Sequence, residues 1–508
     1  MKLTLYLFLI LPFLLFSQNN DKTEYDLLIE NTTVFDGSGS KSYKAHILIL
    51  GDEIAKIEKE LHKNFTAKEV IDASGLVLSP GFIDSHAHGN PLETPEFKNF
   101  LAMGVTTIAL GQDGYSPKEK DLKSWFQKVE EISPATNIAM FAGHNTLRQL
   151  SGVNYDTLPD EKGLLAMEEL LANAFDAGVF GMTTGLEYNP GNFSKKKELQ
   201  RMAKIVGEND GLIMSHMRNE DDAEVENSIS ELLAQGEYCP VHVSHIKSVY
   251  GKGAKRAEGI LKLLDSARTS GIKVTADIYP YNASYTGIAI VFPEWAKKPN
   301  DFEEVVKNRR EELQEFLRNK IAQRNGPEAT LIGSGKFKGK NLKEISEELN
   351  KPFEDVLIDD ISPYGAGGAY FIMDGALQER LVQNEFINIC SDGSPGMRHP
   401  RGYGSFPKVI ETYVLQKQLF SLEEAIYKMT GLPAEIIGIQ DRGLIKEGFK
   451  ADFLIFNTEE IKETATYEEP HQLAKGFKYV FVNGKPAKQG EDFSKERNGK
   501  MLKKNADQ

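Results

Sequence analysis

Two histidines stand one residue apart at the end of an apolar run, in the stretch SPGFIDSHAHGN that covers residues 79–90. Alternate residues of a β-strand point to the same face, so the imidazoles of His86 and His88 can bind one metal ion together. Imidazole is a common ligand of Zn²⁺ in proteins. The pair therefore predicts part of a metal site, provided that other ligands converge on it.

Three further metal-binding side chains follow apolar stretches of the same kind. His216 stands in LIMSHMRNE, His245 in VHVSHIKS and Asp392 in INICSDGSPG. Four imidazoles would be poor core residues, but together with a carboxylate they suit Zn²⁺ or a similar borderline metal ion. We therefore predict a metal site made of His86, His88, His216, His245 and Asp392.

Two other histidines lie in similar positions. His144, in FAGHNTLRQ, also ends an apolar stretch, where it either contacts a substrate or orients another site residue. His242 shares a face with Ser244 if its strand is regular, so it should point away from His245 and towards the helices. We expect a structural role for His242.

These residues fall at the ends of predicted β-strands. Eight β-branched, apolar stretches alternate with stretches of helical periodicity, at residues 82–88, 105–113, 137–144, 179–187, 212–217, 241–247, 272–279 and 386–392. Eight such units close a (β/α)₈ TIM barrel, whose active site lies at the C-terminal ends of its strands. Five of the ten histidines of the chain fall there. The predicted fold is therefore α/β, with a TIM barrel that carries the site.

The two ends of the chain have a different sequence pattern. Short, alternating segments separated by turn residues occur at residues 24–80 and again at 440–490, and they predict one small β-sandwich domain built from both termini. The barrel then covers residues 81–439. The interval at about 282–385, between strands 7 and 8, is too long for a simple connection, and we expect it to form a lid over the barrel mouth.

The first residues resemble a secretory signal. Met1 and Lys2 precede an apolar run at residues 3–16, which is shorter than the roughly 20 residues of a membrane span. We predict a signal peptide at residues 1–17, an exported protein in the periplasm or outside the cell, and no stable membrane span. Leu15 fits the small-residue cleavage rule poorly, which keeps an uncleaved anchor as the alternative.

The amino-acid composition indicates which kind of molecule the protein binds. The 508 residues include 60 Lys and Arg against 74 Asp and Glu, a formal net charge of −14. Nucleic-acid binding needs concentrated positive charge, so we expect a small-molecule substrate and no nucleic acid. The two cysteines, Cys239 and Cys390, lie in or beside predicted strands, and we expect no disulfide.

Taken together, GFIDSHAH, His216, His245 and Asp392 resemble the amidohydrolase superfamily. The motifs GHNTLRQLSG, GMTTGLEYNPG, SHMRNE, VSHIK, DIYPY and SDGSPGMRHPRGYGSFP narrow the resemblance to its N-acyl-D-amino-acid deacylases (D-aminoacylases), over residues from about 25 to about 488. The resemblance implies a zinc-dependent hydrolase with one or two ions. Its reaction would cleave the amide bond of N-acyl-D-amino acids, by metal-activated water, to a carboxylate and a free D-amino acid.

The resemblance also implies roles for individual residues. The four histidines would bind metal, and Asp392 would be the catalytic acid and base and could touch the ion. The free carboxylate of the substrate would be held by Lys247, by Arg401 and by a tyrosine of the YPY segment, which is either Tyr279 or Tyr281.

One position departs from the family pattern. Where the family has a cysteine ligand after strand 2, this chain reads GQDG, with Asp113. A carboxylate can replace a thiolate as a Zn²⁺ ligand, so we expect Asp113 to bind metal, with Glu187 as the alternative. Strand 4, in GMTTGLEY, has no lysine, which argues against a carboxylated-lysine bridge.

Two other functions remain open from the sequence. The same fold could cleave a dipeptide or a cyclic amide, or it could have become a non-catalytic, metal-binding scaffold. Asp392 beside four histidines argues against the scaffold, because a scaffold needs no proton shuttle.

Overall fold

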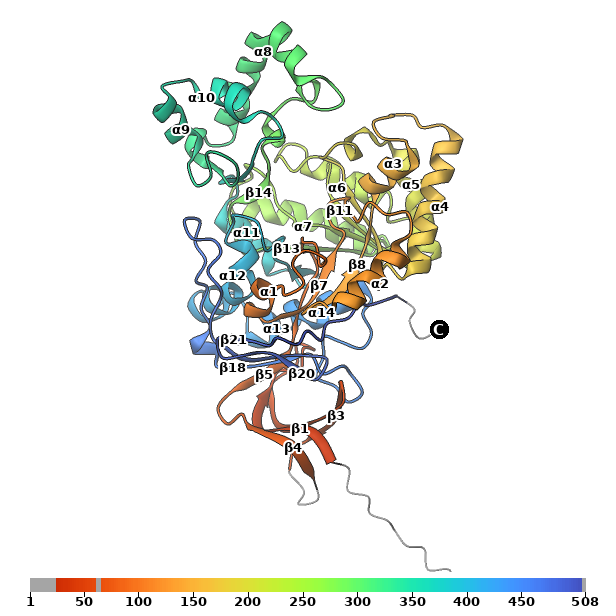
Figure 1. The fold of residues 1–508 in the computed structure, drawn as a ribbon, viewed down its shortest axis with the longest axis vertical. Coiled ribbons are helices and arrows are strands. Elements are labelled where there is room, and N and C mark those ends of the chain that lie inside the picture. The colour runs from red at the N-terminus through yellow and green to blue at the C-terminus, as the bar shows by residue number, and fades with distance from the viewer. Residues whose placement is uncertain (1–23, 61–64, 505–508) are drawn as a thin grey trace, which may run out of the picture.

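A computed structural model of the chain describes residues 24–60 and 65–504. Three parts lie one above another in Figure 1: a small β domain, a barrel, and a helical insertion that contains α8, α9 and α10. The predicted signal peptide, at residues 1–17, lies outside the described residues.

The middle part is a parallel barrel. Hydrogen bonds join the strands in the orders β6-β7-β8 and β9-β10-β11-β12-β13-β17. Phe141 separates β8 from β9, so the third strand of the barrel pairs with one neighbour through β8 and with the other through β9. Beyond β6 and β17, Ala87 and Gly393 form a parallel bridge, and the Asp392 N–H donates to the His86 carbonyl at 2.8 Å. These contacts close the barrel, and the predicted fold class is confirmed.

The barrel strands are shorter than predicted. They are β6 (Phe82–Asp84), β7 (Val105–Leu110), β8 (Asn137–Met140), β9 (Ala142–Gly143), β10 (Gly181–Gly185), β11 (Leu212–His216), β12 (Val241–Val243), β13 (Val274–Ile278) and β17 (Ile387–Ile389). Three site residues beyond them have left-handed backbones: Asp113 with φ 54°, His245 with φ 37° and Asp392 with φ 48°. Non-glycine residues rarely adopt this conformation, which here redirects side chains after the strand has ended.

This irregularity corrects the prediction for His242. Its Nδ1 lies 2.7 Å from the Thr275 hydroxyl and its Nε2 lies 3.0 Å from Asp277. The Asp277 carboxylate also accepts from Ser85, which belongs to the first-strand segment on the other side of β17. His242 is therefore structural, but it points into the barrel and not towards the helices, because the alternation fails before His245.

The helices around the barrel follow its strands along the chain. They are α1 (Lys98–Ala102), α2 (Leu122–Ile132), α3 (His144–Ser151), α4 (Glu161–Ala177), α5 (Lys196–Glu208), α6 (Val225–Leu233), α7 (Ala254–Thr269), α11 (Gly375–Val382), α12 (Arg401–Lys408), α13 (Leu422–Met429) and α14 (Gly431–Ile437). For example, α4 begins after Asp160, whose side chain accepts from the Gly163 N–H, and it ends at Gly178 with φ 106°. Both are standard helix-end signals.

Within the part of the chain that the structure describes, no helix combines the length and the apolar character that a membrane crossing needs.

Both ends of the chain build the β domain. Its N-terminal strands are β1 (Glu24–Val34), β2 (Tyr43–Leu50), β3 (Glu53–Glu58), β4 (Thr66–Asp72) and β5 (Val77–Pro80); its C-terminal strands are β18 (Phe453–Phe456), β19 (Phe477–Val482), β20 (Lys485–Gln489) and β21 (Asp492–Phe493). They form one hydrogen-bonded sheet, which branches where β4 and β5 pair with different halves of β1. The pairing of β18 with β5 joins the two ends.

The insertion between β13 and β17 has its own small sheet and core. It contains β14 (Ser284–Gly287), β15 (Thr330–Ile332), β16 (Gly367–Tyr370), α8 (Phe302–Gln323), α9 (Leu342–Leu349) and α10 (Phe353–Asp355). The predicted interval 282–385 also includes α11, which packs against α7 and β17 as a barrel helix.

Cys239 and Cys390 are both buried and free, as predicted.

Candidate active site

The carboxylate of Asp113 lies at the centre of the four predicted histidine ligands. Its Oδ1 is 3.2 Å from His86 Nε2, 3.3 Å from His245 Nε2 and 3.8 Å from His216 Nδ1. Its Oδ2 is 3.5 Å from His88 Nε2. The fold therefore brings together residues from four different strand ends, and the position that departs from the family pattern stands in their middle.

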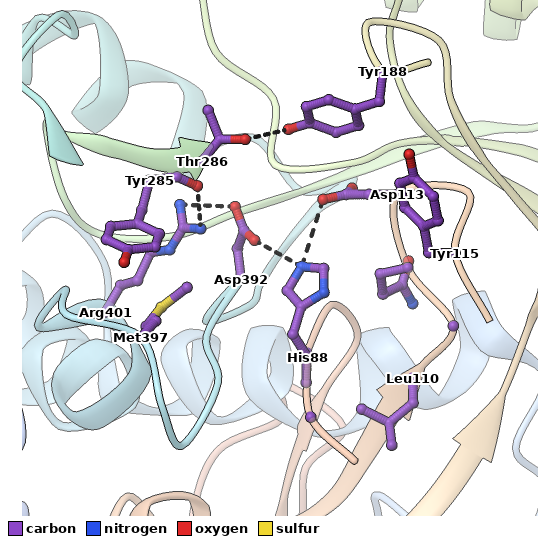
Figure 2. Close-up of a pocket in the computed structure, with 14 residues that line it drawn as sticks. His88, Leu110, Asp113, Tyr115, Tyr188, Tyr285, Thr286, Asp392, Met397 and Arg401 are labelled. Carbon is purple, nitrogen blue, oxygen red and sulfur yellow. Dashed lines mark hydrogen bonds and ion pairs between the residues drawn. The ribbon is translucent and has the colours of Figure 1, made fainter. Parts of the chain in front are cut away.

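Asp392 faces the same histidines from the last strand. Its Oδ1 is 3.1 Å from His88 Nε2 and 3.9 Å from His86 Nε2, and its Oδ2 is 2.8 Å from Arg401 Nη1. Figure 2 shows His88 between Asp392 and Asp113. Burial raises the pKa of Asp392, but the charges of Arg401 and the histidines lower it more, to below its usual range. The carboxylate is therefore ionised at neutral pH.

The described residues offer three overlapping candidate ligand groups, and within each the ligand atoms lie within 4.8 Å of one another. The first consists of His86, His88, Asp113 and Asp392, the second of Asp113, His216 and His245, and the third of Glu187, His216 and Glu220. His86 Nε2 is fully buried and makes no hydrogen bond of adequate geometry, and burial lowers the pKa of His86, which leaves a lone pair free. Nitrogen and carboxylate ligands match Zn²⁺, and Asp113 belongs to the first two groups and could bridge two ions.

Two glutamates hold the outer nitrogens of the ligand histidines. Glu187 Oε2 lies 2.9 Å from His216 Nε2, and Glu220 Oε1 lies 3.2 Å from His245 Nδ1. Metal-binding histidines usually donate their second ring N–H to a carboxylate, which orients the ring. Glu187, the alternative ligand, is thus placed to orient His216. Sequence analysis missed Glu220, although it stands four residues after His216 in the HMRNE motif.

The two predicted cations are buried beside the ligand groups. Lys247 Nζ lies 2.7 Å from Glu220 Oε1 and 2.7 Å from His245 Nδ1. Arg401, which pairs with Asp392, stacks on the ring of Tyr279 at 4.7 Å. Tyr279 also lies 5.9 Å from Lys247, so all three predicted carboxylate-binding groups line one inner cavity.

Tyr281 does not belong to this group, and its prediction as a substrate-binding residue is wrong. Its hydroxyl donates to Glu463 Oε1 at 2.6 Å, and Lys408 lies over its ring. The two tyrosines of YPY point to different sides because the chain has left β13 and turns between them. Of the two tyrosines, Tyr279 is therefore the one that lies beside Lys247 and Arg401.

His144 is also placed away from the site, which corrects its prediction. Its Nε2 lies 2.7 Å from Glu198 Oε1, and Arg148 donates to the same carboxylate at 2.6 Å. All three side chains are buried between α3 and α5. Because β9 ends at Gly143, His144 begins a helix instead of ending a strand, and its side chain turns outwards.

Two cavities adjoin the ligand groups and share lining residues such as Asp113, Asp392 and Arg401. The outer one, of about 360 Å³, is shown in Figure 2 and is lined by His88, Leu110, Asp113, Tyr115, Tyr188, Tyr285, Met397 and Arg401, among others. The inner one has room of only about 30 Å³ and is lined by Lys247, Tyr279, Ser284, Arg324 and Arg401, among others. Tyr285 and Thr286 of β14 line both cavities, so the insertion forms part of the wall of each.

Comparison with known proteins agrees with this geometry. Residues 391–487 match the model of the amidohydrolase family. An N-acyl-D-glutamate deacylase of Alcaligenes xylosoxydans xylosoxydans is 32% identical over 485 residues, which cover 90% of this chain and 93% of the relative. An N-acyl-D-aspartate deacylase of the same organism is 30% identical and covers 94% of this chain and 95% of the relative.

Solved structures give the same result. An N-acyl-D-glutamate deacylase from Bordetella bronchiseptica, solved with zinc and a phosphonate mimic of the tetrahedral intermediate, has a TM-score of 0.81 at 29% identity, covering 95% of this chain and all of that one. A D-aminoacylase described as having a binuclear metal centre has a TM-score of 0.82 at 28% identity, covering 94% of this chain and all of that one. The chain belongs to the N-acyl-D-amino-acid deacylase (D-aminoacylase) family of the amidohydrolase superfamily.

Proposed function

We propose that this protein is a zinc-dependent hydrolase that cleaves the amide bond of N-acyl-D-amino acids, releasing a carboxylate and a free D-amino acid. The observation that carries the proposal is the arrangement around Asp113: histidine and carboxylate groups that can hold metal share this residue, and Lys247, Tyr279 and Arg401 line the same inner cavity. One or two zinc ions fit these groups. Deacylases of the same family at 30% and 32% identity support the substrate class.

Bound zinc supplies a Lewis acid for the amide carbonyl and makes a water molecule more acidic. Asp392 then moves the protons. Arg401 holds its Oδ2, which leaves Oδ1, facing His86 and His88, to accept the proton of the attacking water. The same atom can donate that proton to the nitrogen of the departing amine, which must be protonated to leave.

Lys247, Arg401 and Tyr279 explain why the substrate carries a free α-carboxylate. Arg401 can bind a carboxylate through two N–H groups, and Lys247 adds a second charge. Their position beside Asp392 would fix the amide bond relative to the acid and base.

The rival functions receive less support. Two relatives, at 32% and 30% identity, are deacylases, whereas two dihydroorotase matches are 24% identical over 94% of this chain and 27% identical over 50% of it. No lysine occurs in β10, so the chain lacks the residue from which a carboxylated-lysine bridge would form there.

A substrate screen tests the proposal. We expect zinc-loaded protein to release amino acid from N-acetyl-D-amino acids, and not from their L-isomers or from D-containing dipeptides. Asp392→Asn should lower kcat by a factor on the order of 10³ while the zinc content stays close to that of the wild type. Asp176→Asn, at an exposed position of α4, is the control. Absence of turnover with every N-acyl-D compound would overturn the proposal.

We also propose that the protein is exported, on the basis of the apolar run at residues 3–16. Cell fractionation with mass measurement of the mature N-terminus tests this. Full-length protein in the cytoplasm would contradict export, and full-length protein in the membrane fraction would identify the uncleaved anchor.

A further inference from the structure

Four arginines are buried in the described part of the chain, and three of them pair with a buried carboxylate: Arg148 with Glu198, Arg401 with Asp392 and Arg442 with Asp452. The fourth, Arg324, is 4% exposed, and no described carboxylate lies within ion-pair distance of its guanidinium. Buried charges are normally paired, because the loss of water must be compensated. Arg324 is the exception.

The surroundings of Arg324 do not supply that compensation. It follows the last residue of α8, in the insertion, and its guanidinium lies 4.8 Å from the ring of Tyr370. Its Nε makes no hydrogen bond. The Tyr250 hydroxyl faces Arg324, and burial raises the pKa of Tyr250 to about 12, although the charge of Arg324 lowers it. The hydroxyl is therefore neutral and does not balance the charge of Arg324. A contact with an aromatic face contributes about 0.5–2 kcal/mol, whereas a buried charge without an ionic partner costs several kcal/mol.

Arg324 lines the inner cavity together with Lys247, Tyr279 and Arg401. Three acids of this cavity pair with a lysine or arginine: Glu220 with Lys247 at 2.7 Å, Asp221 with Lys320 at 3.3 Å and Asp392 with Arg401 at 2.8 Å. The other two, Asp113 and Glu187, contact the ligand histidines and do not lie within ion-pair distance of Arg324. The unpaired positive charge therefore faces the place where the amino-acid part of a substrate would lie.

We propose that Arg324 binds the side-chain carboxylate of the substrate, so that the enzyme prefers N-acyl derivatives of acidic D-amino acids. This inference rests on the proposed function and refines it. Lys247, Tyr279 and Arg401 hold the α-carboxylate, and Arg324 holds a second carboxylate reaching from the same Cα. The inner cavity has free room of about 30 Å³, comparable with one or two water molecules, and it shares Asp392 and Arg401 with the outer cavity of about 360 Å³.

The wild-type enzyme provides the first test. We expect kcat/KM for N-acetyl-D-glutamate or N-acetyl-D-aspartate to exceed that for N-acetyl-D-glutamine or N-acetyl-D-asparagine by more than about 10-fold, because the neutral amides have nearly the same shape but lack the charge. A preference for the neutral compounds would overturn the inference while leaving the proposed function intact. Failure to cleave any of the four compounds or other N-acyl-D-amino acids would instead overturn the proposed function.

Variants provide the second test. Arg324→Met should lower kcat/KM for the acidic substrate on the order of 100-fold and change that for its neutral amide by less than about 3-fold. Arg324→Lys should recover part of the loss, because it keeps the charge. Arg318→Met is the matched control: Arg318 lies on α8, the helix that Arg324 follows, is half-exposed and pairs with Glu354, and its replacement should leave the preference unchanged.

Zinc content and the melting temperature separate recognition from folding. If Arg324→Met lowers the rate for acidic and neutral substrates equally, Arg324 has only a structural role and the inference is wrong. If the variant does not fold, the preference of the wild type and of Arg324→Lys decides.

Discussion

At the scale of single residues, Asp113 combines an unusual backbone conformation with contacts to four histidines. It lies within 3.8 Å of four histidines and has a left-handed backbone with φ 54°. Burial raises its pKa, but His86 and His245 lower it well below the usual value, so the carboxylate is ionised. A central anion of this kind suits a ligand shared by two metal positions.

We expect Asp113→Ala to lose at least one zinc ion per chain and to lower kcat/KM by a factor on the order of 10². Asp113→Cys should retain zinc, because thiolate is also a zinc ligand. Metal analysis after dialysis, together with the deacylation rate, checks both variants. Unchanged zinc content and rate in Asp113→Ala would remove Asp113 from the site.

The two tyrosines of YPY form a natural matched pair. Tyr279 lines the inner cavity, whereas the Tyr281 hydroxyl donates to Glu463. We expect Tyr279→Phe to raise KM about 10-fold, the effect of one hydrogen bond to a charged group. Tyr281→Phe should leave kcat and KM unchanged and lower the melting temperature. Kinetics and thermal unfolding of both variants distinguish the roles, and a larger change of KM in Tyr281→Phe would reverse the assignment.

At the scale of secondary-structure elements, the group His144, Arg148 and Glu198 joins α3 to α5 in the barrel wall. Burial raises the pKa of Glu198, but the hydrogen bonds and charges of His144 and Arg148 lower it more, to below the usual value. A carboxylate with a lowered folded-state pKa adds stability that is present above its unfolded pKa, about 4.3, and is lost as the pH falls through the folded value.

Replacing Arg148 tests this dependence of stability on pH. We expect Arg148→Met to lower the free energy of unfolding by about 3 kcal/mol at pH 7, because a buried carboxylate loses its partner. The difference from wild type should shrink as the pH falls from 5 to 3, where Glu198 becomes protonated. Urea unfolding at several pH values measures it. Arg201→Met on α5 is the control, because the ion pairs of Arg201 with Glu161 and Glu168 are partly exposed. It should lower the free energy of unfolding by less than about 1 kcal/mol. Equal decreases in the two variants would contradict the role of burial.

The eight strands were predictable as elements, but their ends were not. Apolar, β-branched stretches identify buried parallel strands because both faces of such strands are covered. The stretch at 241–247, however, forms a strand only at Val241–Val243, because hydrogen bonding to neighbours stops where the loops of the mouth diverge. Side-chain direction beyond that point depends on single backbone angles, such as φ 37° at His245, that no periodicity encodes.

At the scale of the whole molecule, the C-terminal segment extends past the β domain and returns to the barrel. The Gly499 N–H donates to the Pro134 carbonyl, and Ile138 exchanges backbone hydrogen bonds with Lys500 and Leu502. A Cβ atom on Gly499 would lie 2.1 Å from the Thr136 carbonyl oxygen. The absence of a side chain is what lets the segment lie this close.

We therefore expect Gly499→Ala to lower the free energy of unfolding by about 2 kcal/mol, since overpacking against backbone cannot relax easily. Gly375→Ala is the control, because nothing lies within 4 Å of its added Cβ atom and its φ is not positive. Thermal and urea unfolding compare the two variants. Equal stability would mean that the C-terminal segment contributes little to the barrel.

The sequence by itself determined the fold class and most of the metal-binding set. Periodicity specifies strands and helices, and histidines at strand ends meet at one mouth whenever a parallel barrel closes. Only the tertiary structure decided that Asp113 stands between the histidines and that Tyr279, and not Tyr281, reaches the cavity. It also decided that His144 faces Glu198 and that Arg324 is buried without a carboxylate partner among the described residues. Each of these depends on contacts between residues far apart in the chain, in loops whose backbone angles are set by packing and not by local pattern.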